Sequence, residues 1–414
     1  MLKNYIKIAL KVLGRRKFFT FISLFGISLT LVVLMVATTV LDNVFAPRAP
    51  ESKFDRVVGV YRLGMYGPNF NSTGNPGYRF IKEYVLGLPG AEATSVFSNQ
   101  SMLAMYHEGR KIDTHLRRTD GAYWQILDFE FVEGGPYTEA DNENASFVAV
   151  ITDDMRTKLY GRGVSALDKT FEADGQRFRV VGVVRAVPIT RLVGFSEIWA
   201  PIRTLKTREY ERQWMGGFGG IVLARKRGDL EALRSEFKRR TSAFVFDDPK
   251  MYNRIEAGLD TPFESAARNL LGNQVKGNRA LVLQLILGGM ALVFMLLPTM
   301  NLVSINLSRI MERASEIGVR KAFGASSRTL VAQFVVENIV LTVIGGLIGF
   351  VLSVAFLAAL SRAELIPYAV FDVNLRVFLY GLLLAVFFGL VSGVYPAWRM
   401  SRIQAVNALR GGAL

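Results

Sequence analysis

The hydrophobic pattern divides the chain into four long apolar stretches and one long region of ordinary globular composition. The apolar stretches are long enough to cross a bilayer as helices, which takes about 20 residues. They occupy residues 18–41, 280–308, 329–361 and 377–398. The first follows a basic start, as a signal peptide does, but it is too long for such a segment and no small-residue cleavage pattern follows it. We therefore expect an uncleaved anchor and four transmembrane helices.

The region between the first two apolar stretches, residues 42–279, has the patterning of a domain large enough to bury its own core. Compact apolar runs at 147–151 and 178–184 predict strands. Thr152 precedes a predicted short helix that ends near Tyr160. The predicted fold is an α-helical membrane protein with four transmembrane helices. An α+β domain, which we expect to comprise two subdomains, is inserted between helices 1 and 2.

Two further features of this region indicate helical structure. Asp229 is a candidate N-cap for a helix that continues to Phe244. From residue 269 the pattern runs towards the second apolar stretch with only Gly272 and Gly277 as breakers. This run is compatible with a helical stalk that leads into the second transmembrane helix.

Most of the positive charge lies next to the apolar stretches. The chain has 50 Lys and Arg residues and a net charge of +15, and residues 1–17, 309–328 and 399–414 together hold fourteen basic residues and two acids. Because excess Lys and Arg marks the cytoplasmic side, we expect both termini and the 309–328 loop in the cytoplasm of a bacterial cell. Residues 42–279 and the short loop 362–376 are then periplasmic. The charge is explained by topology, so no nucleic-acid partner is expected.

The first 17 residues predict an amphipathic helix. Lys3, Lys7 and Lys11 recur at a spacing of four, with apolar residues on the other side. Such a helix suits the lipid interface, although lysines that merely flank the first span would look similar.

The most specific motif lies around the second predicted cytoplasmic loop. Residues 313–325 read RASEIGVRKAFGA, and residues 392–399 read SGVYPAWR. Both resemble the signature of MacB/FtsX-type ABC transporter permeases. Residues 123–141, 178–184 and 198–201 are similar to the periplasmic core domain of that family.

By this resemblance, the 309–328 loop contains a coupling helix that docks on a cytoplasmic ATPase. Its charges at helical spacing suit a soluble partner, its apolar residues suit a groove on that partner, and its glycines permit a sharp turn. Composition alone leaves open an ordinary positively charged loop. The candidate coupling residues are Arg313, Glu316, Ile317, Gly318, Arg320, Lys321, Phe323 and Gly324.

The last two apolar stretches carry small residues at helix-packing spacing and one acid. Gly345 with Gly349, and Gly389 with Gly393, allow close approach of helices, either within one subunit or across a dimer. Glu337 is a candidate functional acid inside the membrane, with pairing to the nearby basic loop as the alternative.

Catalytic and metal-binding patterns are absent from the sequence. There is no cysteine, and His107 and His115 lack metal-binding spacing. No Gly-Lys dipeptide occurs, which excludes an ATP-binding phosphate loop in this chain. We expect no enzyme activity, no metal and no directly bound cofactor, with ATP and Mg²⁺ held by a separate ATPase.

The resemblance implies a permease subunit that passes ATP-driven motion to its periplasmic domain in order to export a substrate. The implied partners are an ATPase dimer, a second permease copy or paralogue, membrane lipid and, in exporters, a periplasmic adaptor with an outer-membrane channel. Two alternatives stay open: an FtsX-like transmitter that activates a periplasmic partner, and a LolC/LolE-like permease that extracts lipoproteins.

Overall fold

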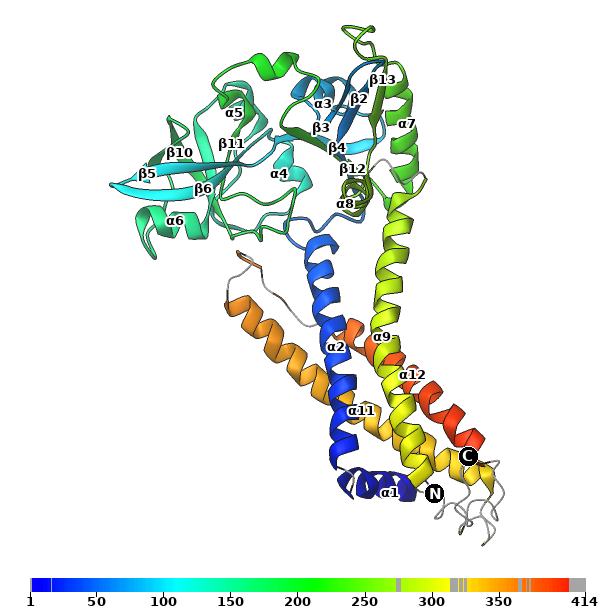
Figure 1. Cartoon of the computed structure of the whole chain (residues 1–414). Coiled ribbons are helices and arrows are strands. Elements are labelled where there is room, and N and C mark those ends of the chain that lie inside the picture. The colour runs from blue at the N-terminus through cyan, green and yellow to red at the C-terminus, as the bar shows by residue number, and fades with distance from the viewer. Residues whose placement is uncertain are drawn as a thin grey trace. The chain divides into compact units, whose positions relative to one another are not determined.

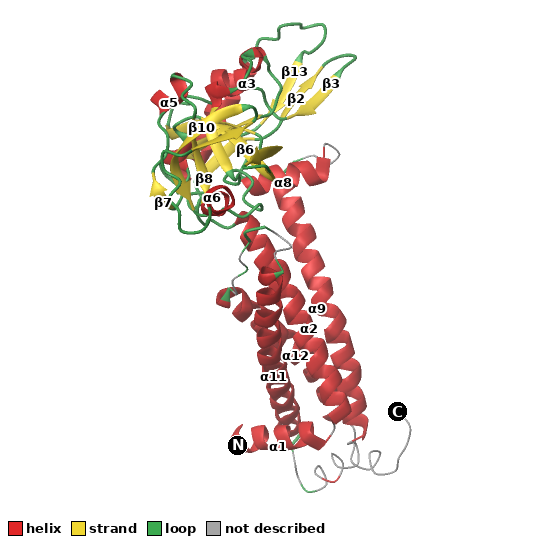
Figure 2. Cartoon of the chain, turned by 90° about the vertical axis from the view of Figure 1, so that its left-hand side faces the viewer, coloured by secondary structure: helices red, strands yellow, loops and turns green. Residues whose placement is uncertain are grey.

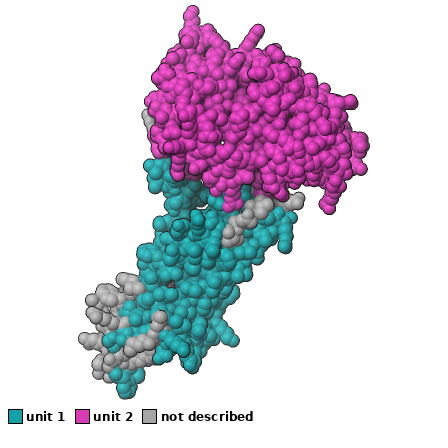
Figure 3. Space-filling model, turned by 180° about the vertical axis from the view of Figure 1, so that it is seen from behind, with its two compact units in different colours: residues 1–43, 281–365, 370–414 teal, residues 44–280, 366–369 magenta. Residues whose placement is uncertain are grey.

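The structure is a computed structural model with two compact units (Figures 1 and 3). The helical unit comprises residues 1–43, 281–365 and 370–414, and the mixed unit comprises residues 44–280 and 366–369. The structure describes residues 2–15, 17–272, 277–312, 319, 323, 326–363, 367–369, 371 and 374–401.

Long apolar helices dominate the helical unit (Figure 2). Its elements are α1 (Leu2–Arg15), α2 (Lys17–Phe45), α9 (Arg279–Glu312), α11 (Ser327–Arg362) and α12 (Leu375–Ser401). Within the described residues, two stretches are long and apolar enough to cross a membrane, namely Lys17–Phe45 and Val331–Arg362. Among the residues that the structure describes, the apolar parts of α9 and α12, Arg279–Phe294 and Leu375–Val391, are shorter. Four transmembrane helices therefore stay a prediction.

Helix packing in this unit centres on α11, which lies against α1 and α12. A small apolar cluster joins Leu13 of α1, Ile27 and Leu31 of α2, and Leu341 of α11, all of which are buried. Lipid-facing helices gain little from the hydrophobic effect, so close packing of this kind is what holds them together.

The mixed unit contains both strands and helices (Figures 1 and 2). Its helices are α3 (Tyr78–Tyr84), α4 (Tyr123–Ile126), α5 (Glu139–Glu143), α6 (Asp153–Tyr160), α7 (Leu230–Ser242) and α8 (Pro262–Leu271), with three short 3₁₀ helices η1 (Ile202–Thr204), η2 (Glu209–Arg212) and η3 (Arg227–Asp229). Its strands are β1 (Val57–Val60), β2 (Leu63–Tyr66), β3 (Asn71–Gly74), β4 (Ala91–Ser98), β5 (Ser101–His107), β6 (Arg110–Thr119), β7 (Phe131–Gly134), β8 (Val148–Thr152), β9 (Thr170–Ala173), β10 (Gln176–Val184), β11 (Ile198–Pro201), β12 (Phe218–Ala224) and β13 (Arg254–Ala257).

Within the described residues, ten of the strands form one sheet and three form another. The large sheet has the order β1-β12-β4-β6-β11-β8-β10-β7, with β5 on β6 and β9 on β10, and the small sheet has the order β13-β2-β3. Most pairs are antiparallel, but β8 with β10 and β6 with β11 run parallel. Three apolar clusters form the core of this unit.

Local signals explain the α6 region well. The strand β8 is buried along its whole length, as its unbroken apolar run predicts. Thr152 then caps α6, because its side chain accepts a hydrogen bond from the backbone N–H of Met155. Gly161 ends the helix with a positive φ of 90°. The two predicted strands and this helix are confirmed.

One expectation about helices is confirmed in position and another is wrong. Asp229 occupies the predicted N-cap position of α7, but its side chain makes no capping hydrogen bond to that helix. Its carboxylate instead accepts from the backbone of Lys226. The predicted continuous stalk is also broken: α8 ends before Gly272, whose φ is 60°, and α9 starts only after Gly277, whose φ is 90°. Two glycines with left-handed backbone are strong helix breakers.

Candidate functional site

The loop between β10 and β11, residues 185–197, has an irregular backbone, and most of its residues are buried or partly buried. We call it the connector loop. Val187, Arg191, Val193 and Phe195 are buried. A buried loop must find partners for its backbone polar groups, and here a side chain from β6 supplies some of them. The Arg117 guanidinium donates from Nε to the Phe195 carbonyl at 3.1 Å and from Nη2 to the Leu192 carbonyl at 3.0 Å.

The connector loop binds the segment that follows α2 through a buried ion pair. Arg191 Nη1 lies 2.7 Å from the Ala46 carbonyl oxygen and 3.4 Å from Glu51 Oε2. The other Glu51 oxygen accepts hydrogen bonds from the backbone N–H groups of Val193 and Gly194. Arg191 and Glu51 are only 2% and 1% exposed. Burial raises the pKa of Glu51 to about 7, although these hydrogen bonds and the charge of Arg191 oppose the rise.

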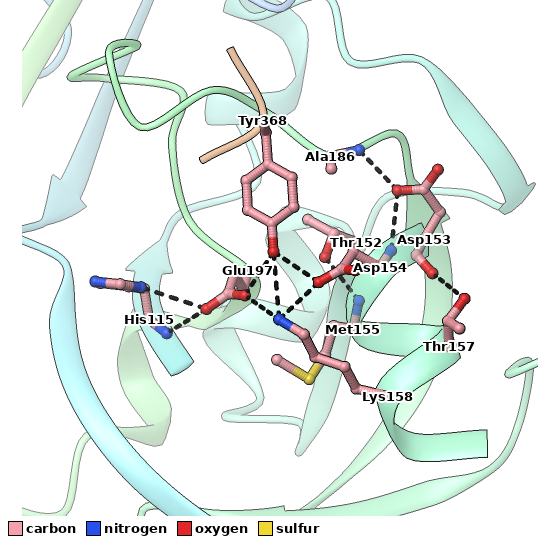
Figure 4. A network of polar contacts seen from close by, with 10 residues as sticks. All are labelled: His115, Thr152, Asp153, Asp154, Met155, Thr157, Lys158, Ala186, Glu197 and Tyr368. Atoms are coloured by element: carbon pink, nitrogen blue, oxygen red, sulfur yellow. Dashed lines mark hydrogen bonds and ion pairs between the residues drawn. The ribbon is translucent and has the colours of Figure 1, made fainter. Parts of the chain in front are cut away.

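The same loop binds the short connection between α11 and α12. The backbone N–H of Ile189 donates to the Pro367 carbonyl at 3.4 Å. Beside it, the Tyr368 hydroxyl reaches Asp154 Oδ2 at 2.6 Å and Glu197 Oε1 at 3.0 Å (Figure 4). Residues 366–369 belong to the mixed unit, although their neighbours on both sides in sequence belong to the helical unit.

Figure 4 shows that Tyr368 completes a polar cluster built on α6 and the end of the connector loop. Lys158 Nζ lies 2.6 Å from Asp154 Oδ2 and 3.0 Å from Glu197 Oε1. His115 Nδ1 lies 3.3 Å from the second Glu197 oxygen, which also accepts from the His115 backbone N–H. Asp154 lies in the first turn of α6, where the helix dipole favours negative charge.

The cluster keeps its acids ionised and its tyrosine neutral. Burial alone would raise the pKa of Glu197, but hydrogen bonds and charge from Lys158 bring that pKa below its ordinary value. The pKa of Asp154 is lowered for the same reasons, with help from Tyr368. Burial and the two carboxylates hold the pKa of Tyr368 far above its ordinary value. Tyr368 is therefore a hydrogen-bond donor at any physiological pH.

Most of the predicted coupling residues lie outside the described residues. These are Arg313, Glu316, Ile317, Gly318, Arg320, Lys321 and Gly324. Of that set, the structure describes Phe323, which is 88% exposed. Its predicted role in ATPase docking stays a prediction.

Three of the four predicted packing glycines lie at helix contacts of the helical unit. A Cβ atom on Gly345 would lie 2.9 Å from the Ile27 side chain, and one on Gly349 would lie 3.1 Å from Leu31 Cβ, so both face α2. A Cβ atom on Gly389 of α12 would lie 2.7 Å from the Thr342 hydroxyl of α11. Gly393 belongs to α12, but its surroundings lie outside the described residues.

Glu337 of α11 is 5% exposed, with buried Gln333 and Asn338 close to it in sequence. Carboxylates buried among apolar membrane helices are often functional, so Glu337 stays a candidate functional residue. Within the described residues, no group of three or more His, Cys, Asp or Glu side chains suits a metal ion.

Sequence reasoning missed the residues of the connector-loop contacts: Glu51, Arg191, Asp154, Glu197 and Tyr368. The Asp154 and Lys158 pair has a local signal, because residues four apart share a helix face. The remaining residues have none, since their partners lie far away in the chain.

Comparison with known proteins identifies the class and the family. Residues 20–240 match the model of the MacB-like periplasmic core domain, and residues 288–405 match that of the FtsX-like permease C-terminal domain. These two domains together define an ABC transporter permease with a periplasmic domain. Within that class, the chain belongs to the MacB-like family. It is thus an inner-membrane protein whose family implies an ATPase partner.

Two relatives and one solved structure illustrate the likeness. The chain is 24% identical over 326 residues to the uncharacterized ABC transporter permease YknZ of Bacillus subtilis strain 168, covering 78% of this chain and 76% of YknZ. It is 26% identical over 295 residues to the pyoverdine export ATP-binding/permease protein PvdT of Pseudomonas syringae pv. tomato, but spans only 41% of that protein. The crystal structure of the extracellular domain of YknZ from Gram-positive bacteria matches with 20% identity and a TM-score of 0.36. That match covers 49% of this chain and 98% of the other.

Proposed function

We propose that this chain is the permease subunit through which a separate ATPase drives motion of the mixed unit during export of a substrate. In this proposal four helices cross the membrane, both termini are cytoplasmic, and the 309–328 loop docks on the ATPase. A second copy or a paralogue completes the permease pair. The membership in an ABC permease family supports the ATPase partner.

The observation that carries the proposal is the contact of Tyr368 with Asp154 and Glu197. Because Tyr368 lies between α11 and α12 in sequence, this contact would give a displacement of those helices a route to the connector loop. Hydrogen bonds to ionised partners are short and strong. They suit a link that has to carry force without a covalent bond.

The docking step is tested first by co-purification. The chain is purified in detergent with its ATPase subunit, as wild type and as Glu316→Lys. We expect the ATPase to accompany the wild type and to be lost, or left uncoupled, with Glu316→Lys. If no ATPase accompanies the wild type, the proposal is wrong.

The transmission step is tested by hydrogen exchange of the connector loop in the complex. We expect a non-hydrolysable ATP analogue to change exchange in residues 185–197 of the wild type. Tyr368→Ala should abolish this change while the ATPase stays bound.

A covalent replacement of the contact is the matched control. The chain has no cysteine, and Ile189 and Pro367 are joined by a backbone hydrogen bond, so their backbones are close enough to attempt a disulfide. Adding Ile189→Cys and Pro367→Cys to Tyr368→Ala should restore the ATP-dependent change when oxidised and lose it when reduced. An ATP-dependent change that survives Tyr368→Ala alone would show that force takes another route.

A further inference from the structure

The outer side of helix α1 carries a row of exposed lysines. Lys3, Lys7 and Lys11 recur every four residues, so they share one face of the helix. The sequence of α1 contains no acid. Within the part of the chain that the structure describes, these lysines also form no ion pair. Three positive charges on one face are thus available to an anionic partner.

The opposite side of α1 is fixed to the rest of the helical unit. Ala9 and Leu13 are only 1% and 7% exposed, and α1 lies against α11. The Thr20 hydroxyl of α2 donates to the Leu13 carbonyl oxygen at 3.0 Å. Because two residues turn an α-helix by about 200°, Lys7 and Lys11 lie on the side of α1 away from Ala9. Figures 1 and 2 show α1 crossing the end of α2, so the lysine row forms an outer surface of this unit.

Two exposed apolar residues lie beside the lysines. Ile6 is 39% exposed and Leu10 is 51% exposed. With Lys3 and Lys7 they occupy positions i, i+3, i+4 and i+7, which form one strip of a helix surface. A lysine can lay its apolar stem along such a strip while its ammonium group stays among polar headgroups. This combination is typical of helices that lie in the lipid interface.

The surface next to α1 favours lipid over a soluble acidic protein as the partner. Helix α2 follows α1 closely in sequence and is long and apolar enough to cross a membrane. At the start of α2, Phe18 and Phe21 are 70% and 66% exposed. Polar headgroups lie at both ends of the hydrocarbon region that such a helix crosses. Lipids that surround the start of α2 therefore bring their phosphate groups to the level of α1.

We propose that the outer face of α1, defined by Lys3, Ile6, Lys7, Leu10 and Lys11, binds anionic phospholipids in preference to neutral ones. The ammonium groups pair with the lipid phosphates, and the two apolar residues contact the acyl chains. Lysine binds phosphate as a point charge, so a headgroup without a cation of its own is bound best. The periodicity of α1 predicts an interfacial helix, and the free lysine face adds the charge of the lipid. Such binding requires neither an ATPase nor transport.

The test compares hydrogen exchange of residues 2–15 in two lipids. The full chain, without any ATPase, is placed in nanodiscs of phosphatidylcholine alone and in nanodiscs that also contain the anionic phosphatidylglycerol. We expect exchange to be at least about fivefold slower with phosphatidylglycerol, because one basic residue near an anionic surface contributes roughly that factor. Equal exchange in the two lipids overturns the proposal. So does the same slowing when inorganic phosphate is added to phosphatidylcholine nanodiscs, since the site would then bind free phosphate.

Three triple variants locate the effect on α1. Changing the three lysines of the row to Gln should abolish the difference between the two lipids, whereas changing them to Arg should keep it. Gln, Arg and Lys have similar helix propensities, so α1 itself should persist.

The matched control removes the same charge from exposed lysines of the mixed unit, as Lys226→Gln, Lys238→Gln and Lys250→Gln together, and should keep the difference. The ratio of exchange rates in the two lipids decides, so a variant that exchanges faster in both lipids is still informative. A ratio that survives in the Gln variant of α1 overturns the proposal, as does its loss in the Arg variant or in the control.

Discussion

The connector loop binds two segments of the chain by different chemistry. On one side, Glu51 and Arg191 form a fully buried pair whose remaining bonds go to backbone groups. On the other side, Asp154 and Lys158 stay 36% and 38% exposed, and the contact to Tyr368 is made of hydrogen bonds around a hydroxyl. A dry ion pair is costly to open because each charge would be stranded. Glu197 is only 6% exposed, but the Asp154 and Lys158 side of the cluster can exchange protein partners for water, so it suits a contact that is made and released.

The largest expected effect comes from stranding a charge in the buried pair. At a pH well above 7, where the carboxyl group of Glu51 is ionised in the folded state, Arg191→Met leaves it buried without its cation and should destabilise the mixed unit by about 3–5 kcal/mol. Denaturant unfolding followed by tryptophan fluorescence measures this. The double variant Glu51→Gln with Arg191→Met should recover much of the loss. A single-variant cost below about 1 kcal/mol would remove the distinction between the two contacts.

A smaller effect is expected from the exposed side. Tyr368→Phe removes one hydroxyl, while Lys158 still neutralises both carboxylates, so the local contact should weaken by about 1–2 kcal/mol. Global unfolding should hardly change, but hydrogen exchange in residues 367–369 should accelerate. Unchanged hydrogen exchange in residues 367–369 would mean that the Tyr368 hydroxyl does not stabilise this contact.

Opposite pH responses would sharpen the comparison. The raised pKa of Glu51, about 7, means that the folded state holds a proton that the unfolded chain has released. Its contribution to stability is therefore present at low pH and is lost as the pH rises through 7, by roughly 1 kcal/mol between about pH 6 and 8. Glu51→Gln should flatten this slope. A slope that is unchanged in Glu51→Gln would assign it to another group.

The acids around Tyr368 should respond in the other direction. Glu197 and Asp154 have lowered pKa values, so their contribution is present above the ordinary values of 4.5 and 3.8 and is lost as the pH falls through the folded values. Hydrogen exchange of residues 367–369 at falling pH, corrected for intrinsic rates, should show the contact opening below pH 4.5. Opening already at neutral pH would contradict the assignment.

The smallest effect should come from a surface pair outside the connector loop. Lys111 and Asp113 lie 3.0 Å apart, each 55% exposed. Lys111→Gln should cost less than about 1 kcal/mol in the same unfolding assay. A larger cost would show that the assay reports charge changes in general rather than these two contacts.

Local features of the sequence were enough to predict β8, α6 and β10, because an apolar run, a capping threonine and a terminating glycine each act within a few residues. Gly345 and Gly349 likewise predicted a close helix contact, but not that the contact is to α2. The stalk failed because the left-handed backbone at Gly272 and Gly277 outweighed the helical pattern on either side.

The contacts of the connector loop were beyond sequence reasoning for a physical reason. A lone glutamate such as Glu51, or a lone tyrosine such as Tyr368, has no periodicity and no neighbour that reveals its partner. Arg117 has no sequence signal of its own either, and its burial in the fold is what distinguishes it. The coupling motif in the 309–328 loop differs from these contacts. Its sequence is specific, but most of its residues lie outside those that the structure describes.

The two connector-loop contacts also differ in when they can form during synthesis. Arg191 pairs with a residue made 140 positions earlier, whereas Glu197 must wait for Tyr368, 171 positions later. Closing such long loops is slow and costs chain entropy. The buried pair can therefore form on the ribosome before α9 exists, while the Tyr368 contact needs α11 to be complete. A chain released before Tyr368 is made would expose Asp154 and Glu197 without their hydrogen-bond partner. Unfinished copies would therefore differ from finished ones at this surface.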